Sequence, residues 1–114
     1  MSRRAEILRD LVSASRPLAE LSKGLALFEW DSDDELVTVD CADVTRMLED
    51  YVTGRRLASD IRAWAETIEG RDDIGLAPAS EPLLREAIFQ LANPELGHAL
   101  TPVLAQKLLR ELQS

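Results

Sequence analysis

The sequence predicts an all-α protein: a small bundle of four main helices, preceded by one or two short N-terminal helices and an irregular arm. Apolar residues recur at helical spacing from residue 40 onward, and glycines and prolines stand where such helices end or begin. With 114 residues, 46% hydrophobic and 30% charged, the chain is long enough to bury one core. We therefore expect a single domain over 1–114, with the N-terminal helix and arm at 1–39 and the bundle at 40–114.

The first 39 residues are the least regular part of the chain. Four apolar residues at helical spacing predict an opening helix that fades near Ser15: Ile7, Leu8, Leu11 and Val12. Residues 17–23 predict a short second helix closed by Gly24. The stretches 25–30 and 35–39 flank an acidic turn, and they can pair as a short hairpin within 25–39. Because two isolated strands are marginally stable, we expect an irregular arm that packs on the bundle through Leu27, Phe28 and Trp30.

Two main helices follow the arm. Asp40 is a predicted N-cap with Asp43 in the first turn, and Gly54 ends that helix. Its apolar stripe is Val44, Met47, Leu48 and Tyr51. The next helix ends at Gly70, which we expect in the left-handed conformation. Its stripe is Leu57, Ile61, Trp64, Ala65 and Ile68. We expect Trp64 to pack in the core, with its indole N–H donating to a backbone acceptor.

Two more helices complete the predicted bundle. Ser80 is a plausible cap for the third, Pro82 fits its first turn, and Asn93 ends it because the next residue is proline. Its buried stripe is Leu84, Ala87, Ile88 and Leu91. Thr101 caps the last helix and Pro102 opens it. The stripe there is Leu104, Leu108 and Leu112.

Charge is the most informative feature of the composition. The net charge is −8, and the segment 29–73 holds 14 acidic and 5 basic residues. Such a surface repels nucleic-acid phosphates and attracts basic partners, so we expect no nucleic-acid binding. No apolar run is long enough for a membrane span or a signal peptide, and we expect a cytoplasmic protein without membrane contact. The single Cys41 excludes an internal disulfide and a cysteine-based zinc cluster.

Two acidic stretches resemble cation sites, but each lacks essential ligands. The Arg-Asp-Asp triplet at 71–73 follows a helix-ending glycine, and adjacent carboxylates alone do not complete a metal site. We interpret it as a polar corner whose acids cap backbone amides or pair with Arg71. The stretch 31–35 begins like a calcium loop, but Leu36 and Ala42 stand where a glycine and a bidentate glutamate are required. We predict no metal ligand.

The sequence contains no assembled catalytic motif. It lacks a glycine-rich phosphate loop, a nucleophile elbow and a His-Glu-x-x-His motif, and His98 is its single histidine. Cys41 is expected at a helix start beside acids, which disfavour a thiolate. We therefore predict no catalytic residue and no cofactor. The alternative enzyme reading, a small metal-dependent enzyme, would use Asp72, Asp73 and His98.

Three stretches carry a resemblance to a widespread family of small, uncharacterised bacterial proteins. They are LALFEWDSDDELVTV, RMLEDYVTGRRLASDIRAWAETIEGRDDI and QLANPELGHALTP. The likeness covers residues 25 to 112 and lies in caps, turns and core positions, so it implies no functional residue. In size, charge and helical class the chain is also similar to the colicin-type immunity proteins, which neutralise basic toxin domains. That similarity implies an immunity or antitoxin role.

The function we expect is non-enzymatic binding of a basic protein partner through an acidic surface, of which an immunity or antitoxin role is one form. We assign ten residues of the segment 29–73 to this surface: Trp30, Asp31, Asp33, Asp34, Glu35, Asp60, Glu66, Glu69, Asp72 and Asp73. Acids there would steer association, and apolar anchors would supply affinity. The alternative is a self-associating structural or regulatory helical domain, a homodimer that buries spare apolar residues such as Phe89.

Overall fold

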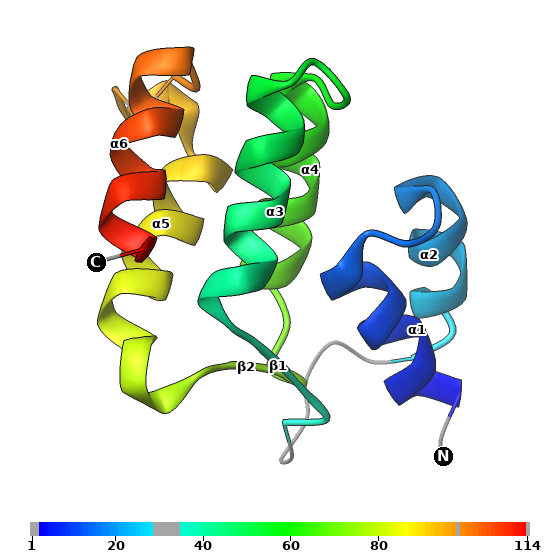
Figure 1. Cartoon of the computed structure of the whole chain (residues 1–114). Coiled ribbons are helices and arrows are strands. Elements are labelled where there is room, and N and C mark those ends of the chain that lie inside the picture. The colour runs from blue at the N-terminus through cyan, green and yellow to red at the C-terminus, as the bar shows by residue number, and fades with distance from the viewer. Residues whose placement is uncertain (1–2, 29–34, 98, 114) are drawn as a thin grey trace.

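The fold consists mostly of helices. The computed structural model describes residues 3–28, 35–97 and 99–113, which form six α-helices and one two-stranded sheet (Figure 1). The all-α prediction is confirmed, because each strand has only three residues. The helices in chain order are α1 (Arg3–Ser13), α2 (Leu18–Leu25), α3 (Cys41–Val52), α4 (Ala58–Glu69), α5 (Glu81–Ala92) and α6 (Pro102–Gln113). Two 3₁₀ turns, η1 (Pro78–Ser80) and η2 (Pro94–Leu96), precede and follow α5.

The helices are arranged in three neighbouring pairs. The α3–α4 pair lies in the middle, with α5–α6 on one side and α1–α2 on the other (Figure 1). Helix α4 packs against α5, and α3 packs against α6. One apolar cluster runs through all three pairs, from Ile7 in α1 to Leu112 in α6. One core therefore connects all six helices.

The predicted helix ends are mostly confirmed. The Asp43 N–H donates to Asp40 Oδ1 and the Asp40 N–H donates to Asp43 Oδ2, each at 3.0 Å, which closes a capping box. Thr101 Oγ1 accepts from the N–H of Leu104 at 3.2 Å, as a cap should. Gly54 has φ 81° and is left-handed. Gly70 is not, since its φ is −83°, so the left-handed prediction for that glycine is wrong.

The small sheet was not predicted. Strand β1 (Val37–Val39) pairs in parallel with β2 (Ile74–Leu76), with Val37 opposite Ile74 and Val39 opposite Leu76. The predicted hairpin within 25–39 is therefore wrong in the residues that the structure describes. Helix α2 runs through Leu25 and a turn follows, so those residues are not extended. Parallel strands need a long crossover, and α3 and α4 provide it.

Three side chains from the bundle bind the carbonyls that end α1. The Trp64 indole N–H donates to the Leu11 carbonyl at 2.9 Å, which confirms the predicted core position and backbone acceptor. Arg46 Nη2 donates to the carbonyl of Val12 at 3.3 Å, and Arg56 Nη2 donates to that of Ala14 at 3.1 Å. Helix ends leave such carbonyls without intrahelical partners and favour cations near them. The N-terminal pair is thus attached to α3, α4 and the loop between them.

Three smaller predictions fail for local reasons. Leu57 is 69% exposed because it precedes α4 rather than lying on its apolar stripe. Leu27 is 77% exposed in the turn after α2, whereas Phe28 does pack against the core. Trp30 lies outside the described residues. Gly24 does not close α2; it lies inside the helix, where an added Cβ would come within 3.0 Å of the Ile7 side chain.

The attachment of α1 can be tested with Trp64→Phe. Phenylalanine keeps most of the apolar contact but has no N–H, so the Leu11 carbonyl would lose the indole donor and keep only the N–H of Ala14. We expect the unfolding free energy to fall by about 1 kcal/mol, measured by urea denaturation followed by circular dichroism. A variant as stable as the parent would show that this hydrogen bond contributes nothing to the attachment.

Candidate functional site

The predicted acidic residues do not gather on one surface. The Asp60 carboxylate accepts from the N–H of Leu57 at 2.8 Å and so caps the start of α4. Glu66 pairs with Arg62 at 2.7 Å on the exposed side of the same helix. Glu69 lies at the opposite end of α4 from Asp60. Four residues of the predicted surface, Trp30, Asp31, Asp33 and Asp34, lie outside the described residues.

Asp73 is the clearest correction. Its side chain is fully buried and accepts hydrogen bonds from Arg4 Nε and from two nitrogens of Arg71, all at 2.9 Å. The prediction that Asp73 lies on an exposed acidic surface is therefore wrong. The interpretation of the 71–73 triplet as a corner is confirmed, because Asp73 pairs with Arg71. Its backbone carbonyl also accepts from the N–H of Leu36 at 2.8 Å, which ties the corner to the start of β1.

The two arginines keep the Asp73 carboxylate charged. Burial by itself would raise the pKa of Asp73, but the hydrogen bonds from Arg71 and Arg4 outweigh it and hold the pKa below its ordinary value near 3.8. A carboxyl with a lowered pKa in the folded state adds stability above its ordinary pKa. That stability is lost as the pH falls through the folded-state value.

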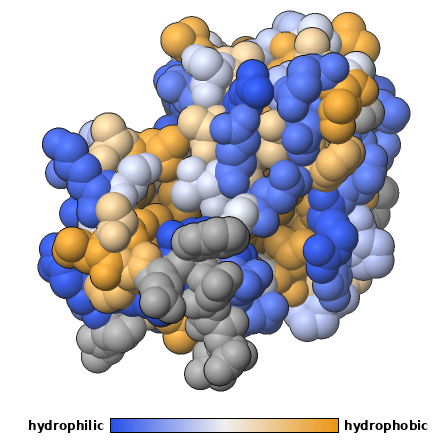
Figure 2. All heavy atoms as spheres, turned by 180° about the vertical axis from the view of Figure 1, so that it is seen from behind, coloured by the Kyte–Doolittle hydropathy of each residue, from blue (hydrophilic) through white to orange (hydrophobic). Residues whose placement is uncertain are grey.

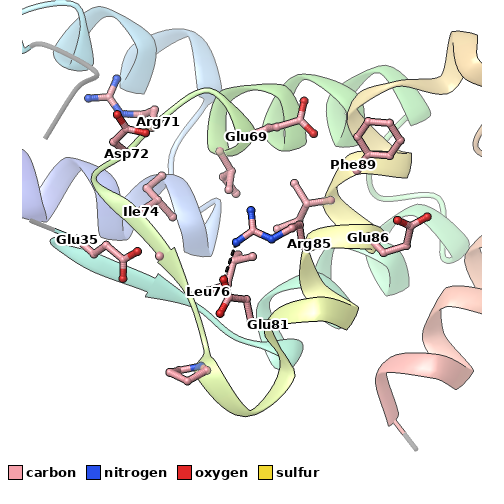
Figure 3. Close-up of a pocket in the computed structure, with 14 residues that line it drawn as sticks. Glu35, Glu69, Arg71, Asp72, Ile74, Leu76, Glu81, Arg85, Glu86 and Phe89 are labelled. Carbon is pink, nitrogen blue, oxygen red and sulfur yellow. Dashed lines mark hydrogen bonds and ion pairs between the residues drawn. The ribbon is translucent and has the colours of Figure 1, made fainter. Parts of the chain in front are cut away.

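The remaining predicted acids meet at a groove. Its volume is about 770 Å³, and it lies between the C-terminal end of α4, strand β2 and helix α5 (Figure 3). Glu35, Glu69 and Asp72 line it, so three of the ten predicted residues are brought together here. Asp60 instead lines a smaller hollow of about 360 Å³ beside α2.

The groove combines an apolar floor with an acidic rim. The apolar lining residues include Ile68, Ile74, Leu76, Ile88 and Phe89. Five acids and two arginines complete the described lining, a formal charge of −3: Glu35, Glu69, Asp72, Glu81, Glu86, Arg71 and Arg85.

Both arginines of the groove are already paired with acids. Arg71 pairs with the buried Asp73, and Arg85 pairs with Glu81 at 2.6 Å along one wall (Figure 3). Among the described residues, the other four lining acids form no ion pair: Glu35, Glu69, Asp72 and Glu86. The groove therefore keeps a negative potential that no neighbouring cation in the described chain neutralises.

The half of the groove that α5 contributes was not predicted from the sequence. Glu81, Arg85 and Phe89 follow one another at i, i+4 and i+8, which places them on one face of that helix. This face includes Phe89, which was predicted as a spare apolar residue and is 39% exposed. A helical-wheel comparison of α4 and α5 would have found the second wall, but not that β2 lies between them.

The described residues do not assemble a metal centre. Among the described residues, no group of three or more His, Cys, Asp and Glu side chains could hold an ion. Asp73, one of the three residues in the alternative enzyme reading, is already occupied by two arginines. His98 lies outside the described residues. The described helices also include none that is both long and apolar enough to cross a membrane.

The face seen from behind is predominantly hydrophilic over the bundle, with smaller hydrophobic areas between the charged side chains (Figure 2).

Comparison with known proteins adds no family to this description: no family model, curated protein or solved structure matches the chain. The likeness to small bacterial helical proteins and to immunity proteins stays a prediction. The groove itself is therefore the basis for inferring a function.

The role of Asp73 can be tested through the pH dependence of stability. We expect the free energy of unfolding of Asp73→Asn at neutral pH to be about 3 kcal/mol lower than that of the parent, because the substitution leaves two arginines with a neutral partner. Below about pH 4 the parent should lose stability as Asp73 is protonated. The unfolding free energies of the parent and of Asp73→Asn, plotted against pH, should therefore converge there.

The matched control is Asp72→Asn, the adjacent exposed acid. Unfolding free energies are measured by urea denaturation at a series of pH values. Those of the control should depend on pH in the same way as those of the parent. Parallel curves for the parent and Asp73→Asn would contradict the assigned role of Asp73.

Proposed function

We propose that the protein is a non-enzymatic interaction module that binds a basic segment of a partner protein in the groove between α4, β2 and α5. One observation carries the proposal: four carboxylates without ion pairs in the described chain surround an apolar floor. Apolar contact supplies affinity in such interfaces, while complementary charge steers association and fixes the register. Neutralisation of a basic toxin domain, as in immunity or antitoxin proteins, is one form of this function.

Self-association is the alternative, and Phe89 favours it because an exposed aromatic side chain is suited to an interface. The groove that Phe89 lines argues against it. Two copies meeting at this groove would bring carboxylates together, and like charges in an interface are costly. Sedimentation analysis separates the two functions. We expect a monomer without partner, and a stable dimer that Phe89→Ser dissociates would favour self-association.

The groove can be tested by charge reversal. The variant Glu69→Lys with Glu86→Lys changes two acids of the groove that form no ion pair within the described residues. A control of equal net charge, Glu20→Lys with Glu49→Lys, changes two exposed acids outside it. A basic protein captured by the parent from host lysate is identified, and its association rate is then measured with each variant at several salt concentrations.

We expect the groove variant to associate at least about tenfold more slowly than the parent, because electrostatic steering is removed at the binding surface. The control should remain close to the parent, and the rate for the parent should fall steeply with added salt. Equal rates for the groove variant and the control would contradict the proposed site. A salt-insensitive rate would contradict the proposed chemistry.

A further inference from the structure

Strand β2 has one hydrogen-bonded edge and one open edge. The carbonyl of Asp73 accepts from the N–H of Val37, and the N–H of Ala77 donates to Val39. Backbone groups along a strand alternate in direction, so Gly75 also faces β1, while Ile74 and Leu76 direct their N–H and C=O groups to the opposite side. In the part of the chain that the structure describes, no segment pairs with that side of β2.

This open edge lies along the groove. Ile74 and Leu76 line it together with Ile88 and Phe89 of α5, and the close-up shows β2 along one wall and α5 along the other (Figure 3). An exposed strand edge is a template for pairing with another extended chain, because its N–H and C=O groups lack partners. A helix placed in the groove would leave these groups without backbone partners, since its own are used internally.

The two faces of the sheet at this edge differ in chemistry. Ile74 is buried and Leu76 is half-buried, and their side chains lie on the same face because they are two residues apart. A side chain at Gly75, between them, would lie on the opposite face of the sheet, where an added Cβ would overlap the carboxylate of Glu35. A strand added to β2 would therefore have apolar contacts on one face and a negative charge on the other.

We propose that the basic segment binds as a third strand on the open edge of β2, an inference that rests on the proposed function of the groove. The occupant is an extended stretch of a partner protein in which lysine or arginine alternates with aliphatic residues. Its aliphatic side chains pack toward the apolar floor, and its cations meet Glu35 and the acidic rim. Its backbone pairs with the N–H and C=O groups of Ile74 and Leu76.

A second copy of this chain does not suit the same edge. Two β2 edges would pair only by bringing two grooves of formal charge −3 against each other. The chain as a whole carries −8, so longer-range repulsion acts in the same direction. Charge complementarity thus selects a basic partner over self-pairing through this edge.

The test uses capped synthetic peptides in which lysine alternates with valine, together with two N-methylated forms. One form is methylated at every lysine amide and the other at every valine amide. In an extended strand these two sets of amides point to opposite sides, so one set faces β2 and the other faces solvent. Both forms carry the same charge and the same side chains. Binding is measured by calorimetry, and amide hydrogen exchange is followed by NMR.

We expect the unmethylated peptide to bind and one methylated form to bind at least about tenfold more weakly. The other form should bind within about twofold of the parent peptide, since its methyl groups leave the pairing amides intact. The amide N–H groups of Ile74 and Leu76 should exchange more slowly when the unmethylated peptide is bound. A peptide in which glutamate replaces lysine should not bind.

The outcomes separate this inference from the proposed function. Equal affinity for both methylated forms, or no binding of the unmethylated peptide at millimolar concentration, would overturn strand addition. The groove would still be judged by the charge-reversal variants and their captured partner. Conversely, equal binding of the glutamate peptide would overturn the charge complementarity, while a difference between the methylated forms would still support strand addition.

Discussion

A buried carboxylate between two arginines determines where the parts of this protein meet. Asp73 binds Arg4 from α1 and Arg71 from the loop just after α4, and its carbonyl accepts hydrogen bonds at the start of β1. Arg4 also lies 5.9 Å from the centre of the Phe28 ring, which joins the turn after α2 to the same point. A buried charge persists only where its partners are held in place, so this cluster constrains four segments at once.

The groove depends on that constraint. Strand β2 begins directly after Asp73, and its pairing with β1 sets its position between α4 and α5. If the corner were displaced, β2 would no longer line the groove, and the acids of α4 and α5 would not face a common apolar floor. The triplet is therefore a structural device with a functional consequence. Asp73 is buried and so is not available to a partner. It fixes the position of the residues that we propose bind one.

The helices could be predicted because their determinants are local. Asp40 with Asp43, the glycine after α3 and the proline that opens α6 each act on their own turn, and the apolar stripes need only one helix to be recognised. The sheet could not be predicted, because Val37 and Ile74 meet across an intervening helical pair and each strand is too short for a periodic pattern. The groove was half predicted. Its acids on 35–72 were identified, but Glu81 and Glu86 depend on the packing of α5 against α4.

In our proposal a basic partner binds in the groove rather than along the acidic segment as a whole. The most direct measurement is a map of amide chemical-shift changes in the isotope-labelled protein when its captured partner is added. We expect the largest changes to cluster at Glu69, Asp72, β2 and the face of α5 that carries Glu81 and Phe89. Changes centred on α2, on α6 or on the exposed face of α3, with the groove unaffected, would contradict it.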